Sequence, residues 1–279
     1  MKAQEWDEKK IMQAVAAAAA DLVLPFMLVG ASARDCLLEQ TPTFRILPRR
    51  TYDVDIAVRV ASWDVYRALV DKLMADYGCD LDPRFKGRLA FPGGLTLDLI
   101  PFGEIADEQG TISWPPEHDV EMGTAGFCAV LDSAISVQVG DTILRVVSFD
   151  GIVLLKFLAW HDRPTRTDDL WDIWFIFDNY VELIDEERLY AEDGIDTDIV
   201  HENEDFDWTE AGGRLVGRDL TRSTGHAGRM LLDWLDPEVT AVQDKLMMAL
   251  ASVVDCTEQR AIDVLRSFRK GMDETTAES

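Results

Sequence analysis

Apolar residues in the first half of the chain recur in turn with the period of a helix and with that of a strand. The resulting order is helix, strand, helix, strand, helix, hairpin. The predicted helices cover residues 7–21, 31–39 and 62–77, and the predicted strands cover residues 25–30, 51–59, 87–91 and 95–102. This order predicts a mixed α/β fold of the α+β class, with a small mixed or antiparallel sheet flanked by helices.

The second half of the chain is predominantly helical in its pattern. A second hairpin, over residues 137–139 and 143–147, precedes the change. The helices predicted after it cover residues 148–161, 167–180, 226–236, 239–252 and 257–270. Residues 185–210 carry twelve acidic side chains, which predicts an exposed helix and an acidic loop. We therefore expect two domains, an α/β domain over 1–147 and a helical domain over 148–279.

The balance of charge limits the kind of partner that the chain can take. Its 279 residues include 52 acidic and 27 basic side chains, and the net charge of −25 opposes nonspecific binding to nucleic acids or anionic membranes. A nucleic-acid substrate would need a local basic patch. Two basic clusters are available, Arg45, Arg49 and Arg50, and Arg84, Lys86 and Arg88, although such clusters are usually solvated surface.

The location expected from the sequence is the cytoplasm. The apolar stretch at residues 14–20 is too short to span a bilayer, and the acidic residues ahead of it are unlike a signal peptide. The four cysteines are widely separated and lack the spacing of a metal site. We expect no membrane partner.

Two aspartates alternate along one apolar run, Tyr52-Asp53-Val54-Asp55-Ile56-Ala57-Val58. Side chains two residues apart in a strand point to the same face, so both carboxylates are expected to face one point. Neighbouring carboxylates repel each other unless a cation lies between them, and Mg²⁺ is the usual one. Asp98 lies inside another apolar run, at residues 95–100, and we expect it to share the site.

A turn of small residues, Gly30-Ala31-Ser32, lies about twenty residues upstream of the aspartates. Such a turn can offer backbone N–H groups and a hydroxyl to a phosphate. Arg34 could contact a phosphate too, or pair with Asp35 or Asp55. A metal site beside a phosphate cradle indicates transfer of a nucleotide.

Lys156 is unusual because it lies in the apolar helical run at residues 152–158. A lysine in that setting either reaches the surface or meets a carboxylate or phosphate. Asp169 and Asp172 are one helical turn apart and share a face, which makes Asp172 a candidate partner for a lysine or arginine.

Other chemistries that use D-x-D fit less well. Haloacid-dehalogenase-type phosphatases require D-x-D-x-[TV], and Ala57 occupies the last position here. Nucleotide-sugar glycosyltransferases hold a metal with D-x-D but do not need the upstream turn. The chain has no P-loop, no G-x-S-x-G elbow and no H-E-x-x-H zinc motif.

The turn at Gly30–Ser32, the Asp53-x-Asp55 strand and the later Asp98 resemble the hG[GS]…DhD…D pattern of the nucleotidyltransferase superfamily, which has the polymerase-beta-like fold. A longer ordered set of motifs, over about residues 25–220, is similar to the predicted nucleotidyltransferases grouped with the AbiEii/AbiGii toxins. These motifs span residues 28–35, 50–55, 98–103, 156–163, 168–172 and 211–219. One departure is Ala31, where the superfamily often has glycine or serine.

This resemblance implies a transferase that moves an NMP from an NTP to an acceptor with Mg²⁺ or Mn²⁺. It implies that Asp53 and Asp55 hold the metal against the triphosphate, and that Asp98 serves a second metal that helps to deprotonate the attacking hydroxyl. It further implies that Gly30, Ala31, Ser32 and Arg34 form the nucleotide-binding group and that Lys156 and Asp172 complete the catalytic set.

The sequence leaves the acceptor open among tRNA, a protein hydroxyl and a small molecule such as an aminoglycoside. The AbiEii-like resemblance suggests a toxin with an antitoxin partner. Two alternatives remain, a nucleotide-binding protein that keeps the fold without transferase activity, and a nucleotide-sugar glycosyltransferase.

Overall fold

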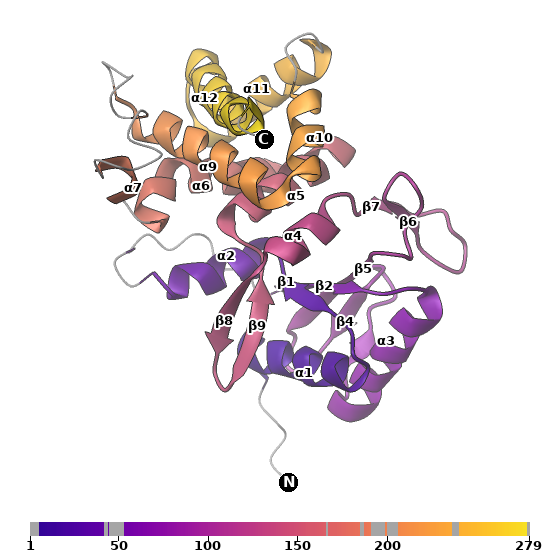
Figure 1. Cartoon of the computed structure of the whole chain (residues 1–279). Helices are drawn as coiled ribbons and strands as arrows, with labels where there is room; N and C mark the ends of the chain where they lie inside the picture. The colour runs from indigo at the N-terminus through magenta and orange to yellow at the C-terminus, as the bar shows by residue number, and fades with distance from the viewer. Residues whose placement is uncertain are drawn as a thin grey trace. The chain divides into compact units, whose positions relative to one another are not determined.

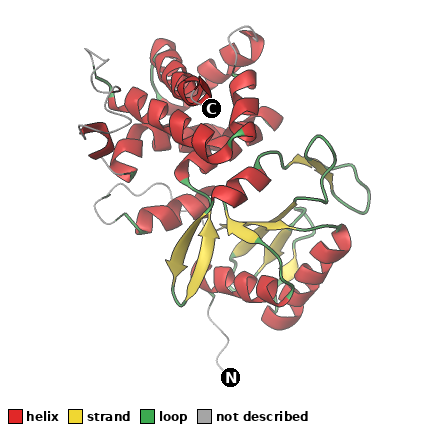
Figure 2. Ribbon diagram, in the orientation of Figure 1, coloured by secondary structure: helices red, strands yellow, loops and turns green. Residues whose placement is uncertain are grey.

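The protein divides into two units in the computed structural model, residues 1–40 with 46–148 and residues 41–45 with 149–279. The structure describes residues 6–41, 44, 53–165, 167–184, 187–190, 199, 206–235 and 240–277. The first unit holds the strands and the second is helical, as the colouring in Figure 2 shows. The predicted mixed α/β fold with a helical C-terminal part is therefore confirmed.

The first unit is built on a seven-stranded sheet with the order β3-β4-β5-β2-β1-β9-β8. Strand β2 runs parallel to β5 and β1 runs parallel to β9, while the other neighbours are antiparallel, so the sheet is mixed. Its strands are β1 (Phe26–Leu28), β2 (Asp53–Arg59), β3 (Asp80–Leu81), β4 (Arg88–Ala90), β5 (Thr96–Phe102), β8 (Ile135–Val139) and β9 (Thr142–Val146).

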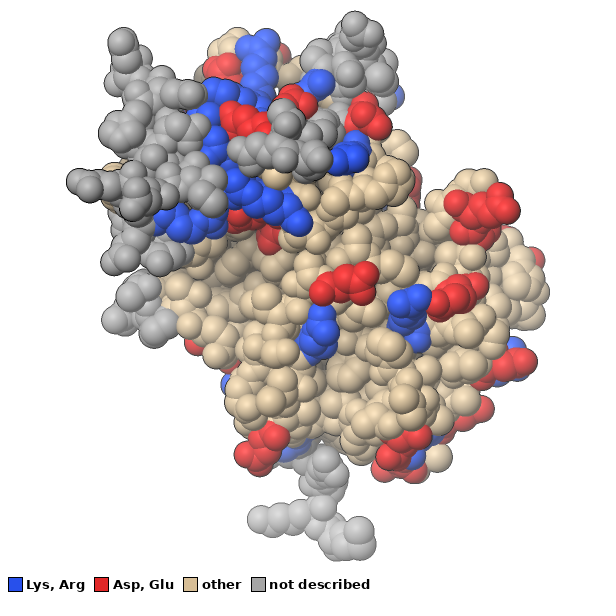
Figure 3. Space-filling model, in the orientation of Figure 1, with Lys and Arg blue, Asp and Glu red and all other residues tan. Residues whose placement is uncertain are grey.

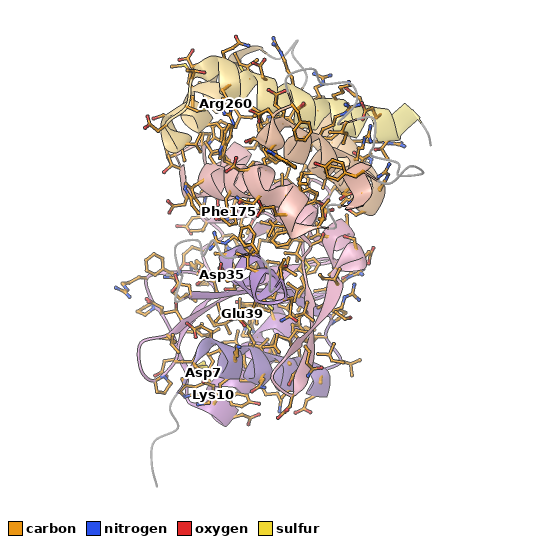
Figure 4. The ribbon with its side chains drawn as sticks, turned by 90° about the vertical axis from the view of Figure 1, so that its left-hand side faces the viewer. Asp7, Lys10, Asp35, Glu39, Phe175 and Arg260 are labelled. Atoms are coloured by element: carbon orange, nitrogen blue, oxygen red, sulfur yellow. The ribbon has the colours of Figure 1, made fainter. Side chains whose placement is uncertain are left out.

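Two helices of the first unit begin where the sequence offers a capping side chain. In α1 (Glu8–Asp21), the Asp7 carboxylate accepts from the N–H of Lys10 at 2.8 Å, and both residues lie at the start of the helix in Figure 4. In α3 (Trp63–Tyr77), the Ser62 hydroxyl accepts from the N–H of Val65. In Figure 1, α1 and α3 lie below the strands and α2 (Gly30–Glu39) lies above them.

Several short elements of the first unit were not predicted. They are β3, the separate two-stranded sheet of β6 (Thr111–Ser113) and β7 (Glu121–Gly123), and α4 (Phe127–Ser133). Each of the unpredicted strands spans at most three residues, too few to show a period of two in the sequence.

The second unit packs its helices around aromatic side chains. The Phe157 ring stacks on Phe268 with centroids 5.5 Å apart, and Phe177 lies 5.2 Å from Phe268. The helices are α5 (Phe149–Asp162), α6 (Thr167–Leu183), α7 (Glu187–Tyr190), α9 (Trp208–Thr224), α10 (His226–Trp234), α11 (Thr240–Val254) and α12 (Glu258–Ala277). None of the helices that the structure describes is both long and apolar enough to cross a membrane.

Helix α9 is the main element that the sequence pattern did not predict. Its glycines lower helix propensity, yet the packing requires them. A Cβ at Gly212 would lie 2.0 Å from the carbonyl oxygen of Phe177, and one at Gly217 would lie 2.1 Å from that of Phe268. Gly271 of α12 is equally close to Arg214 of α9, with a distance of 2.0 Å to its carbonyl oxygen. The glycines of the 211–219 motif thus let α9 approach α6 and α12 closely.

Charged side chains complete the contact between α9 and α12. The guanidiniums of Arg214 and Arg218 both bind the carboxylate of Glu274, at 2.6 and 2.7 Å. Figure 3 shows basic side chains gathered with acidic ones over the helical unit. Arg214 and Arg218 therefore neutralise an acid of their own unit.

Of the two basic clusters considered for a nucleic-acid patch, the one at Arg45, Arg49 and Arg50 lies outside the described residues.

Candidate active site

Strands β2 and β5 bring the three predicted aspartates onto one face of the sheet. In their parallel register Asp53 lies beside Thr96, and Asp55 lies beside Asp98. Residues in register on adjacent strands point to the same side, and Asp53 and Asp55 share a side because they are two apart. We call the side chains of Asp53, Asp55 and Asp98 the acidic face. The intervening Val54 is fully buried on the opposite side.

Arg88 of β4 contacts the acidic face and was not predicted to do so. Its Nε donates to one Asp98 oxygen and a terminal nitrogen donates to the other, each at 2.6 Å. The same guanidinium lies 3.6 Å from an oxygen of Asp53. The hydrogen bonds with Asp98 raise the pKa of Arg88 above its ordinary value, and the charges of Asp53 and Asp55 add to this, so it is a permanent cation.

The sequence contained a signal for this contact. The predicted turn at residues 92–94 closes a hairpin in which the N–H of Phe91 donates to the carbonyl of Leu95. Counting outward from that pair places Arg88 directly opposite Asp98, as observed. The grouping of Arg88 with Arg84 and Lys86 as a basic surface cluster follows charge along the chain alone and leaves this register out.

The acidic face suits a divalent cation that is shared with a substrate. Among the described residues, no group of three or more His, Cys, Asp or Glu side chains is arranged to hold a metal ion by itself. Mg²⁺, however, is usually bound through one or two carboxylates together with substrate phosphates. Asp53 and Asp55 fit that role, whereas both oxygens of Asp98 are engaged by Arg88. The hydroxyl of Thr96 donates to the second oxygen of Asp53 at 2.5 Å and orients it. Metal binding by the three aspartates stays a prediction.

Glycine is required at residue 30 because Asp55 lies against the start of α2. Gly30 has φ +63°, and a Cβ added there would lie 2.6 Å from the nearer carboxylate oxygen of Asp55. The N–H of Val29 donates to the backbone carbonyl of Asp55 at 3.0 Å, which ties the turn to the strand. The turn and the D-x-D strand are therefore in direct contact, as their occurrence together in the sequence suggested.

Ser32 serves the strand rather than an open surface. Its hydroxyl donates to the backbone carbonyl of Asp53 at 2.9 Å and accepts from the N–H of Asp55 at 3.2 Å. The side chain is buried. This hydroxyl fixes the backbone on both sides of Val54, so it positions the two carboxylates. A phosphate contact at Gly30, Ala31 and Ser32 stays a prediction for the backbone N–H groups.

Arg34 follows on the same helix and is buried. Its Nε and a terminal nitrogen donate to one oxygen of Asp35, at 2.9 and 2.8 Å. Asp35 is marked on α2 in Figure 4. Of the partners considered from the sequence, the structure therefore shows Asp35, and a phosphate contact by Arg34 remains a prediction.

In the second unit, Lys156 of α5 meets two carboxylates of α6. Its Nζ lies 2.8 Å from Asp169 and 2.7 Å from Asp172, and all three side chains are largely buried. Burial alone would lower the pKa of Lys156, but the charges and hydrogen bonds of Asp172 and Asp169 raise it above its ordinary value of 10.5. The lysine is therefore protonated at neutral pH. The partnership with Asp172 had been considered from the sequence, and Asp169 is an additional partner.

Comparison with known proteins gives distant likenesses. No protein-family model matches the sequence, and no curated protein matches it. Among solved structures, the chain is similar to the antibiotic-resistance factor ANT(2'')-Ia, with 16% identity, a TM-score of 0.37 and coverage of 60% of this chain and 80% of that one. It is also similar to an antigenic nucleotidyltransferase-like protein from Paracoccidioides brasiliensis, with 19% identity, a TM-score of 0.38 and coverage of 74% and 92%.

A third similar structure is the CCA-adding enzyme of Thermotoga maritima complexed with tRNA. It shares 11% identity at a TM-score of 0.28, covering 96% of this chain and 81% of that one. The similar structures thus include nucleotidyltransferases, at a distance that leaves the functional argument to the residues of the acidic face. Membership of the AbiEii/AbiGii group stays a prediction.

Proposed function

We propose that the protein is a Mg²⁺- or Mn²⁺-dependent nucleotidyltransferase that moves an NMP from an NTP to a hydroxyl-bearing acceptor. The observation that supports this best is the convergence of Asp53, Asp55 and Asp98 on one face of adjacent strands. Three carboxylates on one face repel one another, and a divalent cation bound to a triphosphate would reduce that repulsion.

In this proposal the acceptor oxygen attacks the α-phosphorus of the NTP. The bond between that phosphorus and the oxygen bridging to the β-phosphate breaks, pyrophosphate leaves, and the hydroxyl proton passes to a carboxylate of the acidic face. A divalent cation, when bound, screens the charge of the phosphates and withdraws electron density from the α-phosphorus.

The residues of this chain orient the reactants. Asp53 and Asp55 are held in place by Thr96 and Ser32, so the carboxylates are preorganised before the nucleotide arrives. We assign the β- and γ-phosphates to the backbone N–H groups at Gly30 and Ala31, at the N-terminus of a helix. Lys156 and Asp172 stay in the proposed catalytic set on the family resemblance alone, because Lys156 is buried between Asp169 and Asp172.

The direct test is transfer of label from an NTP labelled in its α-phosphate. The protein is incubated with Mg²⁺ and each NTP, together with tRNA, with a protein mixture or with an aminoglycoside. We expect label on one acceptor class, loss of that label on removal of Mg²⁺, and loss in Asp55→Ala. Metal-dependent NTP binding with no labelled product in any mixture would favour the nucleotide-binding alternative.

Two finer expectations depend on which acceptor and which nucleotide donor the protein uses. Label on tRNA or protein would support a toxin-like enzyme acting in the cytoplasm, for which an antitoxin partner is expected. Binding of a UDP-sugar in place of an NTP would favour the glycosyltransferase alternative, which uses D-x-D in a similar way.

A further inference from the structure

Arg88 is held at the acidic face more firmly than a surface ion pair requires. Its fork-shaped guanidinium matches both oxygens of Asp98, and a third contact joins it to Asp53. The ring of Phe85 lies beneath it, with the guanidinium carbon 4.8 Å from the ring centroid. The Arg88 side chain is 23% exposed, so protein atoms surround most of it.

This arrangement conflicts with a second divalent cation at Asp98. A metal ion needs a carboxylate oxygen, and both Asp98 oxygens already accept from Arg88. A second ion would have to break this bidentate pair or stand beside a positive charge within the acidic face, and both are unfavourable. Asp53 has no comparable conflict with Arg88, because the nearest approach between the two side chains is 3.6 Å.

We propose that Arg88 is a built-in cation that holds Asp98 in place of a second divalent ion, so that the acidic face takes a single divalent cation through Asp53 and Asp55. This inference rests on the proposed function and changes one part of it. The family resemblance implies a second metal at Asp98, whereas in this proposal Asp98 positions the guanidinium. Arg88 then supplies fixed positive charge beside the reacting groups that does not depend on metal concentration.

The test is the number of Mn²⁺ ions bound per chain, measured by electron paramagnetic resonance with a non-hydrolysable NTP analogue present. A Mn²⁺ ion is counted as protein-dependent when its spectrum differs from that of Mn²⁺ bound to the analogue alone, which is recorded in a protein-free titration. The wild type is expected to bind one protein-dependent ion. Arg88→Gln removes the charge and frees Asp98, so a second ion is expected to bind, at least about tenfold more tightly than any second ion in the wild type.

Arg84→Gln is the matched control. Arg84 lies between β3 and β4 and over the same Phe85 ring, but it pairs with Asp82 and is 76% exposed. This variant should bind one ion, like the wild type. The double variant Arg88→Gln/Asp98→Asn should return to one ion, because it lacks the carboxylate that the second ion needs.

Two protein-dependent ions in the wild type, or one ion in a folded Arg88→Gln protein, would overturn the inference. The wild-type count decides the matter even if Arg88→Gln fails to fold, which its thermal unfolding curve will show. No protein-dependent Mn²⁺ in the wild type would instead remove the proposed function, so the two failures are distinguishable.

Discussion

The two units each join a basic side chain to aspartates, but in different surroundings. The Lys156 side chain, 15% exposed, lies between Asp169 and Asp172, which are 2% and 8% exposed. Arg88 lies against an acidic face whose members Asp53 and Asp98 are 49% and 29% exposed. Of these two clusters, the one in the first unit is the more open to solvent.

This difference separates what holds the fold from what can bind a ligand. Buried carboxylates need a cation and hydrogen bonds to be tolerated, so Lys156 is expected to be essential for the stability of its unit. Water can sustain the excess charge of the acidic face until a metal ion arrives. Stability measurements should therefore respond strongly to substitution in the Lys156 cluster and weakly to substitution in the acidic face.

The largest effect is expected from Lys156→Met. This change keeps most of the apolar stem but removes the ammonium from two buried carboxylates, and we expect a loss of about 3–5 kcal/mol in the free energy of unfolding. Urea unfolding followed by circular dichroism measures it. Lys9→Met, which breaks an exposed pair with Glu39, serves as the control and should lower stability far less. Equal losses in the two variants would show that the buried Lys156 cluster matters no more for stability than an exposed ion pair.

The next largest effect is expected from Gly30→Ala. The new Cβ meets both an unfavourable φ and the Asp55 carboxylate, so we expect a loss of about 3 kcal/mol and displacement of Asp55. Gly78→Ala is the matched control, because Gly78 has φ +67° with no atom within 4 Å of the added Cβ. This variant should lower the free energy of unfolding by about 1 kcal/mol, because only its backbone conformation is unfavourable. Equal costs would mean that Asp55 does not lie against the turn.

Asp53→Asn should change stability little. Its side chain is half-exposed and still offers an oxygen to Thr96, so we expect the unfolding free energy to stay within about 1 kcal/mol of the wild type. In the same variant, Mn²⁺ affinity measured with an NTP analogue should fall at least about tenfold, because a charged ligand is lost. A folded Asp53→Asn protein with unchanged metal affinity would remove Asp53 from the site.

The smallest effect is expected from pH. Since the folded-state pKa of Lys156 is raised above 10.5, its contribution to stability is complete below the unfolded-state pKa and is lost only as pH rises through the higher folded-state value. The difference in unfolding free energy between the wild type and Lys156→Met should therefore be constant from about pH 7 to pH 9.5. A decline within that range would show that the lysine loses its proton much more easily.

The acidic face shows which parts of a site the sequence can predict. The period of two in β2 predicts that Asp53 and Asp55 share a face. The apolar residues that flank them indicate a strand inside a sheet. That Asp55 lies beside Asp98 depends on the parallel pairing of β2 and β5, and no turn between these strands sets that register. The contact between Arg88 and Asp98 was predictable, because a tight turn fixes the β4–β5 register.

Helix α9 shows the opposite case. Its glycines reduce local helix propensity, and the helix is stabilised by close contact with α6 and α12, which local sequence does not encode. Likewise, the apolar neighbours of Lys156 in the sequence indicate that its ammonium needs an acidic partner. Only the packing of α5 on α6 shows that both Asp169 and Asp172 bind this ammonium. Local periods therefore predicted the strands that carry the acidic face, whereas contacts between distant elements are set by packing that no local period encodes.

The central claim, that the acidic face binds a nucleoside triphosphate through a divalent cation, is tested most directly by isothermal titration calorimetry. NTP is titrated into the wild type and into Asp55→Ala, each with Mg²⁺ and with EDTA. The account predicts binding by the wild type in Mg²⁺ only, and no such binding by a folded Asp55→Ala protein. NTP binding that is equal in EDTA, or unchanged in Asp55→Ala, would contradict it.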